Sequence, residues 1–145
     1  MSTKELQENL IDILNRWKKV ENASVASTGD VISKTDNPVI RLVMELIQRD
    51  SQFHYRVQEF MVDILKGKAI AFSPDDLVDV WDGIEKHIEI EKNTIRLAEE
   101  ALEALKGRKM VIHEYLLQYL MEDEKKHNLL LDSLRTIKKG MYPYG

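Results

Sequence analysis

A glutamate and a histidine three residues apart interrupt an apolar helical stripe in the segment MEDEKKHNLLLDSL, residues 121–134. On a period of 3.6 residues, Glu124 and His127 fall on one stripe with the leucines at 117, 120, 131 and 134. A buried carboxylate is costly unless a charged partner or a metal ion neutralises it. Because residues i and i+3 share a helical face, one cation could bind both side chains. The segment therefore predicts a metal-binding E-x-x-H pair.

Three other segments also carry an ionisable residue near the middle of an apolar stripe. Asp50 and His54 interrupt the second stripe of the chain, and Glu91 interrupts the third. Glu21 interrupts the first and weakest stripe, where the neighbouring Val20 is the alternative inward residue. The four interruptions together indicate a polar layer inside a set of packed helices.

The two remaining histidines are interpreted differently. His87 precedes Glu91 by four residues, so it lies on the same helical face and could add an imidazole to a metal site. The alternative for His87 is a histidine at the edge of the stripe that is bonded to water. His113 lies near the start of the last helical segment, away from the polar layer, and we expect it to be structural.

Proline and glycine divide the chain into four long helical segments. Two prolines mark helix starts, because each follows a good N-cap residue in Asn37-Pro38 and Ser73-Pro74. Glycines at positions 67, 107 and 140 follow periodic segments, where glycine ends a helix at least cost. The predicted helices cover residues 3–33, 38–66, 74–106 and 109–139.

These helices predict an all-α fold, an antiparallel four-helix bundle that forms a single domain over residues 1–140, with residues 141–145 as a tail. Each of the last three helices is about 45 Å long at 1.5 Å per residue, which is typical of bundle members. If consecutive helices form hairpins, the ionisable residues of the first and second helices lie at the same height along the bundle axis. Those of the third and fourth helices also share one height, and both heights lie near the middle of the bundle.

The two predicted hairpins resemble each other. RDSQFH at residues 49–54 aligns with EDEKKH at residues 122–127 and pairs His54 with His127. Glu21 and Glu91 are separated by 70 residues, close to the offset of 73 residues in that alignment. The interpretation is a faint internal duplication.

The composition of the 145-residue chain excludes several classes of site. Because there is no cysteine, iron–sulfur clusters and thiolate sites are excluded, and any metal ion must be bound by histidines and carboxylates. The formal net charge of −4 comes from interleaved acidic and basic residues, which gives no nucleic-acid footprint. No apolar run approaches the roughly 20 residues of a membrane span, and MSTKELQENL lacks the apolar centre of a secretory signal. We therefore expect a cytoplasmic protein without a nucleic-acid or membrane partner.

A glutamate on the first and third helices with an E-x-x-H on the fourth resembles the ferritin-like di-metal carboxylate bundles, such as rubrerythrins and bacterioferritins. The resemblance covers nearly the whole chain in layout and is specific in EDEKKHNLLLDSL. It implies one or two ions per chain, iron or alternatively manganese, and oxidoreductase chemistry on dioxygen or peroxide. With His87 added, the candidate ligands are Glu21, Asp50, His54, His87, Glu91, Glu124 and His127.

The chain departs from the ferritin-like pattern at two points. Ser51 stands three residues before His54, where the family has glutamate, so either Asp50 replaces that carboxylate or the first half of the site is incomplete. The linker between Lys66 and Ser73 reaches only about 25 Å, which is short for a crossover along the bundle. A mono-metal, an altered di-metal and a metal-free site all stay open, as does the relative direction of the second and third helices.

Two functional classes follow from these residues. The first is a ferritin-like metal-binding protein that binds iron or manganese and, if it is an enzyme, acts as a di-metal oxidoreductase. The alternative is a non-catalytic structural or interaction bundle whose inward acids and histidines form a buried polar network without metal. In either class the long amphipathic helices favour a homo-oligomer, most simply a dimer.

Overall fold

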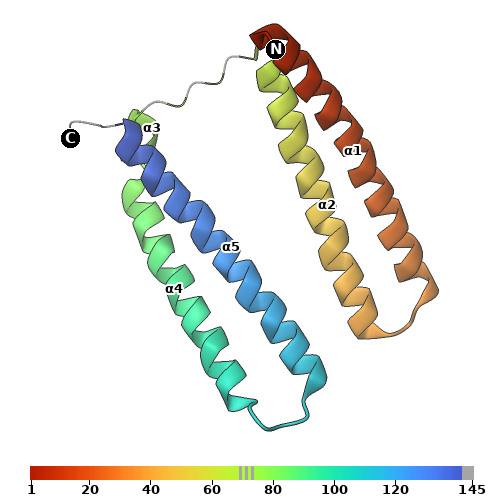
Figure 1. Cartoon of the computed structure of the whole chain (residues 1–145). Helices are drawn as coiled ribbons and strands as arrows, with labels where there is room; N and C mark the ends of the chain where they lie inside the picture. The colour runs from red at the N-terminus through yellow and green to blue at the C-terminus, as the bar shows by residue number, and fades with distance from the viewer. Residues whose placement is uncertain (69, 71, 73, 142–145) are drawn as a thin grey trace. The chain divides into compact units, whose positions relative to one another are not determined.

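The computed structural model describes residues 1–68, 70, 72 and 74–141, and these residues contain helices and no strand. The predicted all-α class is therefore confirmed. The helices, coloured along the chain in Figure 1, are α1 (Thr3–Lys34), α2 (Pro38–Leu65), α3 (Pro74–Val78), α4 (Trp81–Ala104) and α5 (Val111–Met141).

The helices form two compact units, Met1–Ile70 and Ala71–Gly145. The N-terminal hairpin consists of α1 packed against α2, and the C-terminal hairpin consists of α3, α4 and α5 (Figure 1). The assembly of a single ferritin-like four-helix bundle stays a prediction. Of the predicted tail, only Met141 lies within the described residues, where it ends α5.

Side-chain caps fix the ends of the N-terminal hairpin. The Ser2 hydroxyl accepts a hydrogen bond from the Glu5 N–H at 3.2 Å, and the Glu5 carboxylate accepts one from the Ser2 N–H at 2.7 Å. Asn37 caps α2 as predicted, because its side-chain oxygen accepts from two N–H groups in the first turn. Arg41 then donates to the main-chain oxygens of residues 32 and 35, which ties the turn to the end of α1.

The hairpin interface decides which residues face inward. On α1, Glu21 is buried and its neighbour Val20 is 61% exposed, so the glutamate takes the inward position. On α2, the buried residues are Ser51, Gln58 and Val62. The apolar stripe that Asp50 and His54 were predicted to interrupt is partly exposed in this hairpin, because the side of α2 that packs on α1 is rotated by about one residue, or roughly 100°.

The predicted helix 74–106 is wrong in one respect, because the structure divides it into α3 and α4. The Val80 N–H bonds to the Leu77 carbonyl three residues back, and α4 restarts when the Ile84 N–H bonds to the Val80 carbonyl. This tight turn lets the short α3 contact both α4 and α5. Leu77 and Trp81, on the two sides of the break, are both buried.

Two of the three predicted glycine helix ends are confirmed. Gly67 has φ 97° and Gly107 has φ 74°, a left-handed conformation that other residues adopt only at a cost. The third prediction is wrong, because α5 continues through Gly140 to Met141. Glycine lowers helix propensity by only about 1 kcal/mol, which the preceding turns of α5 can offset.

The C-terminal hairpin has a small apolar core at the α4–α5 interface. Ile88 is 1% exposed, and Ala98 and Met121 are also buried, while Glu91 lies among them on the same side of α4. The core therefore holds a carboxylate between two apolar layers.

Within the described residues, no helix combines the length and apolar character that a membrane span requires.

We expect the substitution Ile88→Ala to lower the free energy of unfolding by about 2–5 kcal/mol, because it leaves a cavity in this core. Denaturant unfolding followed by circular dichroism measures the change. The matched control is Ile90→Ala on the exposed side of α4, which should change the value by about 0.5 kcal/mol or less. Equal losses for the two variants would contradict the described packing.

Candidate metal centre

Three ionisable side chains converge at the α4–α5 interface. Glu91 comes from α4, and Glu124 and His127 come from α5. One carboxylate oxygen or ring nitrogen from each residue lies within 4.8 Å of the others. A divalent ion that binds carboxylates and imidazole needs donor atoms gathered in this way.

One nitrogen of His127 lies close to both carboxylates. Its Nδ1 is 3.5 Å from Glu91 Oε1 and 3.5 Å from Glu124 Oε2. His87, one turn before Glu91 on α4, places its Nε2 2.9 Å from Glu91 Oε1. The spacing predicted this arrangement, because residues i and i+3 or i+4 share a helical face.

The burial of these groups differs sharply. The Glu91 side chain is 8% exposed and that of Glu124 is 18% exposed, whereas His127 and His87 are 40% and 54% exposed. With both glutamates ionised, Glu91 Oε2 is buried without a hydrogen-bond donor among the described residues. Such an oxygen costs roughly 1–3 kcal/mol or more unless a proton or a cation neutralises it.

A shared proton is one way to neutralise the two carboxylates. The hydrogen bond with Glu124 lowers the pKa of Glu91 below its ordinary value of 4.5, and His127 and His87 act in the same direction against the effect of burial. The same hydrogen bond raises the pKa of Glu124, together with burial and the charge of Glu91. At a pH between the lowered pKa of Glu91 and the raised pKa of Glu124, the pair therefore holds one shared proton.

Asp123 is a contributor that the sequence reasoning missed. Its Oδ2 lies 3.4 Å from His127 Nε2, on the side of the ring away from the two glutamates. A carboxylate at Nε2 favours a proton on that nitrogen, and this leaves Nδ1 free to bind a cation. The signal was present in the sequence, because Asp123 precedes His127 by four residues.

The N-terminal hairpin repeats part of this arrangement. His54 Nδ1 on α2 lies 3.4 Å from Glu21 Oε2 on α1, and that oxygen is buried without a hydrogen-bond donor among the described residues. Ser51, at the position that corresponds to Glu124, is buried and its hydroxyl is hydrogen-bonded to the Ser24 hydroxyl at 2.8 Å. This hairpin therefore brings together one carboxylate and one imidazole.

Asp50 does not join this pair. It is exposed on α2, and within the described residues no hydrogen bond or ion pair links it to Glu21 or His54. The reason is geometric, since Asp50 precedes the inward Ser51 by one residue and points about 100° away from it. His113 is exposed in the first turn of α5.

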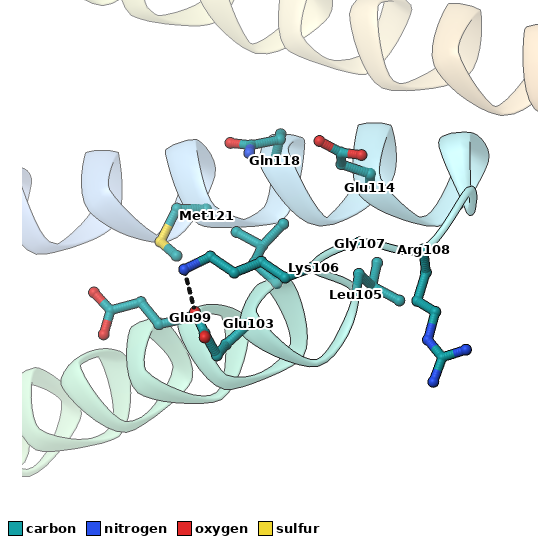
Figure 2. A pocket seen from close by; sticks show the side chains of 10 residues that line it. Glu99, Glu103, Leu105, Lys106, Gly107, Arg108, Glu114, Gln118 and Met121 are labelled. Carbon is teal, nitrogen blue, oxygen red and sulfur yellow. Dashed lines mark ion pairs between the residues drawn. The ribbon is translucent and has the colours of Figure 1, made fainter.

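The open side of the C-terminal cluster is a surface depression of about 500 Å³. His87, Glu91 and His127 line it together with Leu130 and Leu131. A second depression of about 520 Å³ lies near the α4–α5 turn (Figure 2) and is lined by carboxylates, long polar side chains and the apolar Leu102, Leu105 and Met121. An ion pair of 2.9 Å between Lys106 and Glu103 neutralises part of that wall, and no imidazole lines it. The ligand cluster and the second depression are therefore separate features.

Comparison with known proteins gives no relative to guide the assignment. No family model matches the chain, and neither a curated protein nor a solved structure matches it.

We expect the glutamate pair to make the free energy of unfolding of the metal-free protein depend on pH, with a loss of stability both above and below an optimum. The raised pKa of Glu124 contributes stability below its ordinary value, and this is lost as the pH rises through the raised pKa. The lowered pKa of Glu91 contributes stability above its ordinary value, and this is lost as the pH falls through the lowered pKa. The pair is thus most stabilising near pH 4.5, where it carries one proton.

The variant Glu124→Gln tests this directly, because its amide can donate to Glu91 at any pH. Without metal at pH 7, it should raise the free energy of unfolding by on the order of 1 kcal/mol, and the gain should shrink toward pH 4.5. Denaturant unfolding across this pH range measures the change, with the exposed Glu122→Gln as control. A loss of stability in Glu124→Gln at pH 7 would contradict the shared proton.

Proposed function

We propose that the protein binds a divalent metal ion, iron or alternatively manganese, through Glu91, Glu124 and His127. The observation that carries the proposal is the buried Glu91 oxygen without a donor, which faces a second carboxylate and an imidazole. Two ionised glutamates carry the charge that one divalent ion neutralises. Carboxylate and imidazole ligands without thiolate suit iron and manganese, and the absence of cysteine agrees with such a site.

His87 is proposed as a further donor to the same ion. Its ring lies against Glu91 and lines the open side of the cluster, so a small rotation would bring a nitrogen toward the ion. The donor set is then two carboxylates and two imidazoles from one hairpin. Asp123 would orient the His127 ring from behind.

The ferritin-like assignment and oxidoreductase chemistry belong to the same proposal. The C-terminal hairpin carries a glutamate on one helix and E-x-x-H on the next, which is half of the pattern that those bundles share. Iron or manganese with an open coordination position would supply redox chemistry with dioxygen or peroxide. The residues of this chain would bind the ion, and the chain has no cysteine with which to hold an iron–sulfur or rubredoxin-type centre as its electron donor.

Metal titration tests the proposal. We expect the full chain, freed of metal, to bind one Mn²⁺ or, without oxygen, one Fe²⁺ at the C-terminal cluster, as measured by calorimetry and elemental analysis. Glu124→Gln should abolish binding, because it removes a charged ligand and keeps the shape. His87→Ala should weaken binding roughly tenfold.

The control for this titration is Glu122→Gln, which changes the charge of α5 equally but lies outside the cluster. It should leave the affinity within about twofold. If the wild-type protein binds neither Mn²⁺ nor Fe²⁺ in this titration, or if the Glu124→Gln variant binds the ion as well as the wild type, the proposal is overturned.

A non-catalytic bundle with a buried polar network is the second candidate, and the N-terminal hairpin favours it. There, Glu21 with His54 and Ser24 with Ser51 form polar contacts without a group of three metal ligands among the described residues. If the C-terminal cluster is only such a network, replacing Glu91 and His127 together by leucine should keep or raise the stability of the protein as purified. If it binds metal, the same double variant should lose the added stability that Mn²⁺ gives the wild type.

A further inference from the structure

Asp123 contacts a lysine and a histidine of its own helix at the same time. Its Oδ1 forms an ion pair of 2.8 Å with Nζ of Lys126, and its Oδ2 lies 3.4 Å from Nε2 of His127. Lys126 and His127 follow Asp123 by three and four residues, so the three side chains are neighbours on the surface of α5. Each carboxylate oxygen of Asp123 therefore has a partner of its own.

The ion pair of Lys126 differs from that of the lysine beside it. The side chain of Asp123 is 23% exposed, whereas Lys125 lies 3.5 Å from Glu122, whose side chain is 71% exposed. Water solvates the charges of an exposed pair and leaves little interaction between them. A carboxylate with less access to water depends more on its protein partner. Of the two lysines, Lys126 is therefore the one placed to fix the orientation of a carboxylate.

The orientation of Asp123 decides which nitrogen of His127 can bind an ion. Nδ1 of the ring lies 3.5 Å from both Glu91 and Glu124, so Nδ1 is the nitrogen on the side of the cluster. A neutral imidazole that binds an ion through Nδ1 carries its proton on Nε2, and this N–H needs an acceptor. Asp123 Oδ2 can accept it only while the carboxylate is directed at the ring. A side chain without a partner would exchange among several rotamers.

We propose that Lys126 is a positioning residue of the metal centre. Its ammonium group holds one oxygen of Asp123, so that the other oxygen accepts the Nε2 proton of His127 and Nδ1 stays available for the ion. This inference rests on the proposed metal binding and adds a residue that is not itself a ligand. Because Asp123, Lys126 and His127 all belong to α5, the arrangement is complete within one helix.

The positive charge of Lys126 makes the direction of the effect informative. On charge alone, removing an ammonium group near the cluster would strengthen the binding of a divalent cation. Lys126 is 53% exposed, so solvent and salt reduce this effect to about twofold or less. Loss of positioning acts the other way, because a group behind a metal-binding histidine commonly changes affinity by about 10–100-fold and Lys126 acts through such a group. Weaker binding without the ammonium group therefore indicates positioning.

Calorimetric titration of the metal-free full chain with Mn²⁺ tests the inference. We expect Lys126→Gln to weaken binding by about threefold or more, and Lys126→Arg to keep the affinity within about twofold, because a guanidinium group can bind the same carboxylate oxygen. The matched control is Lys125→Gln, which removes an equal charge from the next residue and should not weaken binding. The thermal unfolding midpoints of the metal-free variants should equal that of the wild type, which separates positioning from a general loss of structure.

A double-mutant cycle shows whether Lys126 acts through Asp123. Asp123→Asn should weaken Mn²⁺ binding by about tenfold, because the amide is a poorer acceptor for the His127 N–H than a carboxylate. In the Asp123→Asn protein, Lys126→Gln should cause no further loss of affinity, since the lysine no longer has a carboxylate to hold.

Several results would overturn the inference. If the wild type binds Mn²⁺ and Lys126→Gln binds it equally well or more tightly, the metal-binding function stands and the positioning role fails. Equal weakening by Lys125→Gln, or losses from Asp123→Asn and Lys126→Gln that simply add, would also refute the positioning role. If the wild type binds no Mn²⁺ at all, the proposed function fails and the inference fails with it.

Discussion

The structure of the C-terminal hairpin depends on how one buried carboxylate is neutralised. Glu91 lies on the apolar side of α4 between Ile88 and Ala98, and one of its oxygens is buried without a hydrogen-bond donor when Glu124 is ionised. The neighbouring residues offset the free-energy cost of this buried charge. Glu124 can lend a proton, His127 and His87 lower the pKa of Glu91, and Asp123 holds the far side of the His127 ring. A divalent ion would satisfy the same carboxylates without the shared proton, and for this reason we propose that the cluster binds one.

The two hairpins show how much one residue changes this balance. Both place a buried glutamate on their first long helix against a histidine on their second, with separations of 3.4 Å and 3.5 Å. In the N-terminal hairpin, Ser51 replaces the second carboxylate and pairs with another serine. One negative charge fewer removes both the repulsion and the capacity to neutralise a divalent ion. The internal duplication stays an interpretation, in which Ser51 of the first half stands at the position of Glu124 in the second.

The sequence predicted the residues of the cluster better than the arrangement of the helices. Periodicity placed Glu91, Glu124 and His127 on inward stripes, and all three meet in the structure, because helical spacing alone determines which side chains share a face. It missed the packed side of α2 by one residue, since Ser51 and Gln58 are buried there while neighbouring apolar residues stay partly exposed. Apolar periodicity cannot identify an interface whose contacts are small and polar. The break between α3 and α4 was also missed, because no proline or glycine marks it and the tertiary contacts of the short helix decide it.

The most direct test of the central claim is anomalous scattering from crystals of the full chain grown with Mn²⁺. We expect a peak about 2.0–2.3 Å from oxygens of Glu91 and Glu124 and from Nδ1 of His127. A map without a peak at this cluster would contradict metal binding there.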